Sequence, residues 1–452
     1  MRPPDGSAGR GRALSARGDC SRASGGASRS RPNSARRAAA ELALVTTLNG
    51  ATEQPVTGIV VSEDGSGLVT AGLDGQLTLW TLALDEQTSL GTTMRSAQGW
   101  RRTLTQPVGG GEINAIALLG SVVACGCQDG SVRLFRLFKE AASFVLYSLL
   151  RKQHTSTAAP AAPAAAGTAS TFAAATGSAN EFAAPAAAPP SEVMCVALSS
   201  SVLASRNAPL LASGAQDGSV CLWDSSSGRL MHRLQAHEHD GTGWVMALVL
   251  SRHADGRSGL MLTASYDHTV RVWSQTADDI GGGGSSFGGG SFCSPSAGGP
   301  GGPGGPGGGP GWVLERTLEG HTDGVLGLEL SRTRRHAFSA SNDHSVRVWE
   351  LASGACLQVL EQHGCSVSAL GWHLASGCLA TGAEDGTVHL WDVAAFDEAA
   401  SQPPSASEKK PAEIVQTLNI EHCEVLCLVP SADGTALFCG LDDGSLAVLG
   451  GK

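Results

Sequence analysis

A histidine, a hydroxyl residue and an aspartate recur at fixed spacing in the second half of the chain, and these are the residue types of a hydrolytic triad. His321, Ser339 and Asp343 form one set, and the same three types return 42 residues later. In a triad the carboxylate orients the imidazole, and the imidazole takes the proton of the attacking hydroxyl. An active site needs one such set, whereas here the set is repeated, so we predict a structural role and no catalysis.

A tryptophan follows each of these aspartates by six residues and completes a group of four side chains that can satisfy one another. The carboxylate accepts from one imidazole nitrogen, the other nitrogen accepts from the hydroxyl, and the hydroxyl oxygen accepts from the indole N–H. Removing one member leaves the others unsatisfied, so the group should hold neighbouring strands together. We predict three structural tetrads: His237, Thr263, Asp267 and Trp273; His321, Ser339, Asp343 and Trp349; His363, Thr381, Asp385 and Trp391.

The stretch from His321 to Trp391 contains this pattern twice without interruption. A period of about 40 to 45 residues that ends in Trp-Asp or a near variant is typical of a four-stranded propeller blade. The chain thus resembles the WD40-repeat family over about residues 42–449, which implies an all-β fold, a seven-bladed β-propeller. Two repeats are degenerate, because Cys125 and Phe135, and then Cys439 and Leu449, replace the hydroxyl residue and the tryptophan. Inner strands are expected to start near Val56, Ile113, Val193, Val245, Val325, Val367 and Val425.

The two ends of the repeat region are complementary. A strand pattern at residues 44–48 precedes the first repeat and belongs to no earlier blade, while the last repeat, from Glu424, has only three strands. We predict that the N-terminal strand closes the C-terminal blade, so that no unpaired sheet edge is left open to aggregation.

Composition divides the chain into a tail at residues 1–40 and a propeller at residues 41–452. The tail has nine Arg against Asp5 and Asp19 and no apolar periodicity, so we expect it to be disordered. An organelle transit peptide and a nucleic-acid-binding tail have the same composition and stay open as alternatives. The whole chain has a net charge of -10, so the propeller itself is acidic and unsuited to binding nucleic acid across its surface. Low-complexity insertions are expected at 157–190 and 280–311, with a shorter loop at 395–412.

Cysteine usage and hydropathy indicate the surroundings of the protein. The twelve cysteines lack the spacing of a zinc finger, so we expect reduced thiols, no cofactor and a location in the cytoplasm or nucleus. The polar run His-Glu-His-Asp at 237–240 is more typical of a solvated turn than of a metal site. No apolar run reaches the roughly 18 residues of a membrane span, so we predict no membrane association.

The resemblance also implies where a partner binds. In the family, the top face is built from the loops that enter the inner strands and from the residue before each turn aspartate. The corresponding positions that we predict to bind a partner are Glu112, Gln128, Glu192, Met194, Gln216, Trp244, Met246, Tyr266, Leu326, Asn342, Glu384, Glu424, Leu426 and Asp442. Five are carboxylates and none is Lys or Arg, and Trp244 and its neighbours add an apolar anchor, so a basic segment of a partner protein is expected here. The alternative is that Trp244 packs against the adjacent blade and the acids are merely solvated.

The resemblance implies a non-catalytic scaffold or adaptor in a multiprotein complex, with protein partners and no small-molecule substrate. An RNA- or chromatin-associated factor that uses the basic tail is the alternative. A substrate adaptor of a ubiquitin ligase is less favoured, because such receptors typically carry Trp-Asp-x-Arg. Here Trp223, Trp349 and Trp391 are followed by DSS, ELA and DVA.

Overall fold

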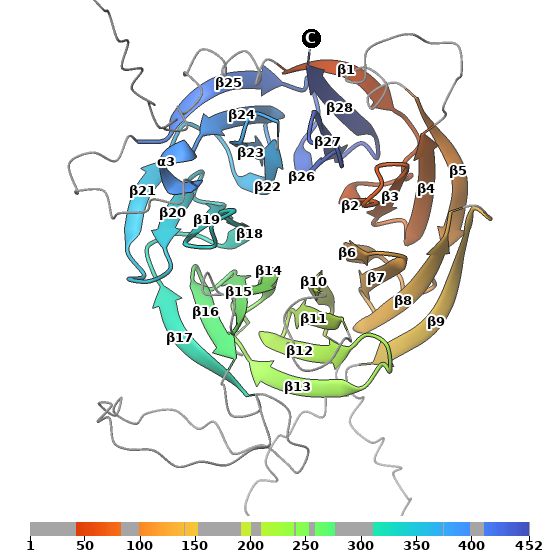
Figure 1. Cartoon of the computed structure of the whole chain (residues 1–452), viewed down its shortest axis with the longest axis horizontal. Helices are drawn as coiled ribbons and strands as arrows, with labels where there is room; N and C mark the ends of the chain where they lie inside the picture. Colours follow the sequence, from red (N-terminus) through yellow and green to blue (C-terminus); the bar gives the residue numbers. More distant parts are fainter. Residues whose placement is uncertain are drawn as a thin grey trace, which may run out of the picture.

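Seven four-stranded antiparallel sheets form a ring in the computed structural model (Figure 1), which confirms the predicted seven-bladed β-propeller. The structure describes residues 42–82, 99–139, 141–151, 191–199, 209–238, 241–252, 258–275, 311–373, 375–397 and 411–451. The tail at 1–40, the insertion at 157–190 and nearly all of the insertion at 280–311 lie outside these ranges. Of the loop expected at 395–412, the first residues belong instead to a short helix, α3 (Ala394–Asp397).

The first four blades follow one another along the chain. Blade one contains β2 (Val56–Val61), β3 (Gly67–Gly72), β4 (Gln76–Leu82) and β5 (Trp100–Pro107). Blade two contains β6 (Ile113–Leu119), β7 (Val122–Cys127), β8 (Ser131–Phe138) and β9 (Ser143–Arg151). Blade three contains β10 (Val193–Ser199), β11 (Leu210–Ala215), β12 (Ser219–Asp224) and β13 (Leu230–Gln235). Blade four contains β14 (Val245–Arg252), β15 (Gly259–Ser265), β16 (Val270–Gln275) and β17 (Trp312–Leu318).

The remaining blades complete the ring. Blade five contains β18 (Val325–Leu330), β19 (His336–Ser341), β20 (Val346–Glu350) and β21 (Cys356–Leu360). Blade six contains β22 (Val367–His373), β23 (Cys378–Ala383), β24 (Thr387–Asp392) and β25 (Glu413–Asn419). Blade seven contains β26 (Val425–Pro430), β27 (Ala436–Leu441) and β28 (Leu446–Gly451), and its outer strand is β1 (Leu42–Leu48), which pairs antiparallel with β28.

Each blade buries both faces, because each packs against two neighbours. The second strands are therefore buried at nearly every position, as in β15 and β23. The outer strands are instead exposed or half-buried at most positions, as in β13 and β17. The core is a set of apolar clusters between blades, such as the one that joins Leu262 and Val272 of blade four to Trp349 of blade five. Among the described residues no helix has the length and apolar character that crossing a membrane requires.

A bulge recurs at the start of every inner strand. In β2, Val56 pairs with Gly72 and Gly58 pairs with Ala71, so that Thr57 has no partner of its own. A bulge re-aims the unpaired side chain. The seven bulged residues are Thr57, Asn114, Met194, Met246, Leu326, Ser368 and Leu426.

Candidate functional site

One edge of the ring, here called the top face, carries the tight turn between the second and third strands of every blade. In each turn an aspartate Oδ1 accepts the backbone N–H two residues later, at 2.8–3.1 Å. The residue between them has a positive φ and is glycine in five blades, but His268 and His344 in the other two. The turn aspartates are Asp74, Asp129, Asp217, Asp267, Asp343, Asp385 and Asp443.

A second repeated bond joins two top-face positions in each blade, and most of these positions are among those predicted to bind a partner. The residue before the turn aspartate donates its N–H to the carbonyl of the residue before the inner strand, at 2.9–3.2 Å. The bonded pairs are Leu73 with Pro55, Gln128 with Glu112, Gln216 with Glu192, Tyr266 with Trp244, Asn342 with Gly324, Glu384 with Ser366, and Asp442 with Glu424. Fourteen positions from seven blades therefore form one rim around the axis.

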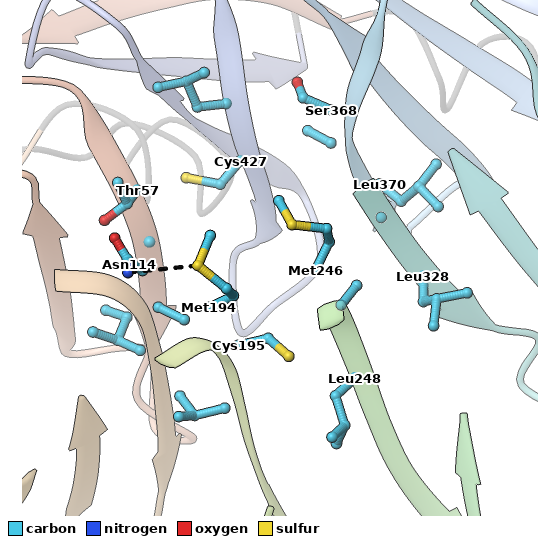
Figure 2. Close-up of a pocket in the computed structure, with 18 of the residues that line it drawn as sticks. Thr57, Asn114, Met194, Cys195, Met246, Leu248, Leu328, Ser368, Leu370 and Cys427 are labelled. Atoms are coloured by element: carbon cyan, nitrogen blue, oxygen red, sulfur yellow. Dashed lines mark hydrogen bonds between the residues drawn. The ribbon is translucent and has the colours of Figure 1, made fainter. Parts of the chain in front are cut away.

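Inside this rim the bulged residues surround the central opening. Figure 2 shows Thr57, Asn114, Met194, Met246 and Ser368 around it, and the cavity has a volume of about 310 Å³ with lining residues from every blade. Met194, Met246 and Leu426 make part of this lining apolar. The polar members bond to the next blade, because Asn114 Nδ2 donates to Val193 O at 3.1 Å and the Thr57 and Ser368 hydroxyls donate to backbone carbonyls. Leu326, also predicted here, is half-buried beside lining residues Gly327 and Leu328.

Carboxylates of blades six and seven gather on the rim. Glu384 and Glu424 are exposed, and Asp442 Oδ1 accepts the N–H of Glu424 at 2.8 Å. Partial burial raises the pKa of Glu424, and the negative charges of Asp442 and Glu384 raise it further. Three carboxylates from two blades thus repel one another in one region.

Blade four contributes the apolar part of the rim. The rings of Trp244 and Tyr266 have centroids 5.8 Å apart and planes tilted by 38°. Tyr266 leans on blade five so closely that a Cβ at Gly324 would lie 2.6 Å from its Cδ2. Asn342 Nδ2 donates to Tyr266 Oη at 3.4 Å, and Asn342 Oδ1 accepts from Ser366 Oγ at 2.7 Å. Blades four, five and six are therefore linked across the rim by side chains.

The rim residues of blades two and three are less open. Those predicted to bind a partner are all half-buried: Glu112, Gln128, Glu192 and Gln216. Their turn aspartates are paired, since Arg133 lies 2.9 Å from Asp129 and Arg233 lies 3.6 Å from Asp217. The negative charge of the top face is therefore most available on blades six and seven.

Below the rim, the second predicted tetrad is joined by hydrogen bonds. His321 Nδ1 lies 2.8 Å from Asp343 Oδ2, and its Nε2 lies 2.7 Å from Ser339 Oγ. Trp349 Nε1 donates to the same hydroxyl oxygen at 2.8 Å. The corresponding bonds of blade four measure 2.8, 2.9 and 3.1 Å and connect His237, Asp267, Thr263 and Trp273.

The direction of these bonds determines the protonation of His237. The indole donates to Thr263, so the Thr263 hydroxyl donates to Nε2, and Nδ1–H donates to Asp267. Burial lowers the pKa of His237. Burial opposes the ionisation of Asp267, but hydrogen bonds from His237 and Thr269 outweigh it and lower the pKa of Asp267 to about 2. A neutral imidazole beside an ionised carboxylate satisfies every member.

The third predicted tetrad is connected differently. Thr381 bonds to His363 Nε2 at 2.6 Å and accepts from Trp391 at 3.0 Å, but His363 Nδ1 lies 3.3 Å from Thr387 Oγ1. Asp385 Oδ1 accepts from the Thr387 hydroxyl at 2.5 Å. The predicted direct bond from His363 to Asp385 is thus replaced by a link through Thr387.

A second histidine stands beside the network of His363. His389 stands where blades four and five carry Arg271 and Arg347, and its ring centroid lies 4.3 Å from that of His363. Burial lowers the pKa of His363, and the neighbouring His389 lowers it further, to about 4. Burial also lowers the pKa of His389, so both rings stay neutral.

The other blades keep only parts of the network. Trp80 donates to Thr70 at 3.3 Å, and Trp223 donates to Ser213 at 3.1 Å. In blade seven His422 is exposed.

Burial decides the chemistry of these histidine, hydroxyl and carboxylate groups. Ser339 has the distances of a triad nucleophile, but it is 0% exposed and its oxygen already accepts the indole N–H. It therefore offers no nucleophile to a substrate. Of the polar run at 237–240, His237 is committed to its tetrad, and residues 239 and 240 lie outside the described ranges.

Comparison with known proteins identifies the architecture. A family model described as WD domain, G-beta repeat matches residues 42–81, 187–224, 228–274, 312–350 and 354–392. Among solved structures, the WD40 β-propeller domain of Doa1 aligns with a TM-score of 0.55 at 18% identity, over 91% of this chain and 97% of that chain. The chain is a WD-repeat protein.

Several curated WD-repeat relatives share part of the chain. Mitochondrial division protein 1 of Neurospora crassa is 38% identical over 95 residues, which are 21% of this chain and 14% of that protein. Nuclear distribution protein nudF of Aspergillus niger is 24% identical over 194 residues, 42% of this chain and 34% of that protein. Pre-mRNA-processing factor 19 homolog 2 of Arabidopsis thaliana is 27% identical over 186 residues, which are 41% of this chain and 28% of that protein. The chain thus spans about a third or less of each, and WD-repeat propellers generally serve as interaction scaffolds.

Proposed function

We propose that this WD-repeat protein is a non-catalytic scaffold of a multiprotein assembly and that its top face binds a basic segment of a partner protein. The observation that carries the proposal is the group of Glu384, Glu424 and Asp442 from two neighbouring blades, where burial and then the neighbouring negative charges raise the pKa of Glu424. A Lys or Arg side chain placed there is attracted by all three carboxylates. Arginine is favoured, because its planar fork can bond two carboxylates at once.

The aromatic pair of blade four supplies the apolar part of the same site. Trp244 and Tyr266 present ring surface at the rim, and Met246 continues it into the opening. Aromatic residues beside charged ones are typical of the residues that dominate binding energy. The partner segment therefore combines basic residues with an apolar one that reaches the opening.

The relatives support the general function and name no shared partner. Their names refer to mitochondrial division, nuclear distribution and pre-mRNA processing. Processes this different have a scaffold in common rather than one ligand. We infer a location in the cytoplasm or nucleus.

Charge reversal at one rim position tests the proposal. We expect Glu424→Lys to weaken binding of a fluorescent Arg-rich peptide by about five- to tenfold, measured by anisotropy, since it turns one attraction into a repulsion. Trp244→Ala should also weaken a peptide that carries a central Leu. The matched control is Glu63→Lys, which reverses an exposed carboxylate in the turn after β2, at the opposite edge of the ring. Equal peptide affinities of the wild type, the two rim variants and the Glu63→Lys control would contradict the proposal.

The basic tail supports a second candidate, contact with RNA or chromatin. Nine Arg among residues 1–40 match the charge that phosphate binding needs. Salt-dependent RNA binding that disappears when residues 1–40 are deleted would favour this function, and RNA binding that survives the deletion would contradict it.

A further inference from the structure

The outer strand of blade two, β9, gathers several exposed apolar side chains on the circumference of the ring. On β9, the side chains of Val145, Leu146, Tyr147 and Leu149 are between 37% and 49% exposed, and Phe138 at the end of β8 is 45% exposed. β9 is nine residues long, the longest strand of the described chain. It is also an edge strand that faces away from the ring (Figure 1), and within the described residues no further strand pairs with its outer side.

The outer strands β5 and β17 carry residues that protect a sheet edge. Charged side chains and proline discourage pairing with another chain. β5 has Arg101, Arg102 and Pro107, and on β17 the exposed apolar residues are followed at once by Glu315 and Arg316. β9 has no charged residue and no proline from Ser143 to Leu150. A contiguous exposed apolar patch on such an edge is typical of an interaction site.

The charges around β9 are positive. The guanidinium of Arg136 lies 5.5 Å from the centre of the Tyr147 ring, and Arg151 is exposed at the end of the strand. Exposed Arg229 adjoins Gly228, where an added Cβ would lie 2.9 Å from Ser148 Oγ. Asp224, the carboxylate of that same turn, already accepts from the Ser226 hydroxyl at 2.6 Å.

Positive charge at both ends also argues against self-pairing of this edge. Two copies of β9 paired antiparallel would bring Arg151 of one towards Arg136 of the other, because exposed Arg136 lies opposite Val145 near the start of β9. Like charges opposed across strands are destabilising. The charge pattern therefore favours an occupant of opposite sign.

We propose that β9 is a docking edge for an extended segment of a partner protein, with branched or aromatic residues at its centre and Asp or Glu at its ends. The segment adds a fifth strand to blade two. Backbone hydrogen bonds to the free edge provide affinity, the exposed apolar side chains provide contact area, and the arginines select the acidic flanks. This surface is separate from the top face and can be occupied together with it.

Leu146 and Leu149 are the residues to change. They lie opposite Phe135 and Arg133 of β8, two residues apart, so they share one face of the blade. Neither belongs to the packed clusters between blades. The matched control is Val313→Asp with Leu314→Asp on β17, which changes the same net charge at equally exposed apolar positions.

The probe is a synthetic nine-residue peptide, Asp-Glu-Val-Thr-Val-Tyr-Val-Glu-Asp, titrated into the full-length protein by calorimetry. Comparison peptides carry lysines at the four acidic positions or N-methyl groups on alternate central residues. We expect the acidic peptide to bind, Leu146→Asp with Leu149→Asp to weaken it at least about fivefold, and the β17 control to stay within about twofold. The lysine and N-methylated peptides should bind at least about fivefold more weakly.

Several results would overturn the inference. These are absence of binding by the acidic peptide, equal binding of the lysine peptide, or equal loss in the β17 control. A concentration-dependent dimer in analytical ultracentrifugation that the β9 variant abolishes would assign this edge to a second copy instead. Unchanged thermal unfolding of both variants verifies that the effects are not losses of folding.

Discussion

Replacing Asp343 by asparagine is the sharpest test of the structural role of the tetrads. The carboxylate accepts four bonds: from His321 Nδ1, from the Thr322 N–H at 3.1 Å, and from the N–H and hydroxyl of Ser345 at 3.0 and 2.6 Å. An amide keeps one oxygen and points its NH₂ group at the donating imidazole. The change therefore removes the two bonds that Oδ2 accepts, from His321 and from Thr322, and leaves the buried Nδ1–H of His321 unsatisfied.

We expect Asp343→Asn to lower the free energy of unfolding by about 2 to 4 kcal/mol. The loss is this large because the His321 and Asp343 side chains are nearly inaccessible to water, at 1% and 7% exposed. Asp385→Asn is the matched control, since Asp385 has the same turn position but is exposed and bonds to Thr387, whose bonds one amide oxygen can accept. The measurement is urea denaturation followed by circular dichroism. Equal losses in the two variants would refute the role assigned to the histidine link.

The pH dependence of the same variant gives an independent check. Burial opposes the ionisation of Asp343, but bonds from His321 and Ser345 outweigh it and hold its pKa below the usual value of 3.8. The ionised group therefore contributes stability above the unfolded pKa and loses it as the pH falls through the folded pKa. Asp343→Asn should flatten this acid limb while leaving affinity for a top-face ligand within about twofold of wild type. Loss of binding with an unchanged denaturation midpoint would contradict the structural interpretation.

Two further perturbations follow from the packing and from the histidine pair. Gly382→Ala should destabilise by about 1 to 3 kcal/mol, because the new Cβ would lie 2.5 Å from Val425 Cγ1, whereas Gly451→Ala, with open space around it, should be neutral in the same urea titration. His363 is 6% exposed with a pKa of about 4 against 6.5 when unfolded, so protonation favours the unfolded state. Stability should be complete above pH 6.5 and fall by about 3 kcal/mol as the pH decreases to 4, and His363→Gln should reduce that slope; a parallel slope in both proteins would rule out His363 as its source.

The repeat itself made most of the fold predictable. The spacing of hydroxyl residue, aspartate and tryptophan reports a strand, a turn and the next strand, so inner strands predicted near Val56 and Val325 start at these residues. Even the degenerate second repeat keeps Asp129 and its turn. Local chemistry determines these features, and local chemistry can be read from sequence.

Features that depend on contacts between blades could not be predicted in the same way. The sequence shows that His363 and His389 are present, but the 4.3 Å distance between their ring centroids depends on how the chain segments that carry them run in space. The contact of Tyr266 with Gly324 joins residues of different blades and has no signal in either repeat alone. The exposed residues of β9 have the composition of a buried strand, and only the sheet order places them at an edge.

The pairing of β1 with β28 has a consequence for folding during synthesis on the ribosome. Leu42 N donates to the side chain of Gln416, 374 residues further along, and β1 pairs with a strand made later still. At about 5 to 20 residues per second, translation needs roughly 20 to 75 seconds to cover that separation. During that time Leu42, Val45 and Leu48 lack the residues against which they pack in the folded ring. The first strand of the ring to be synthesised is therefore among the last to pair. A chaperone has the longest time to bind this strand.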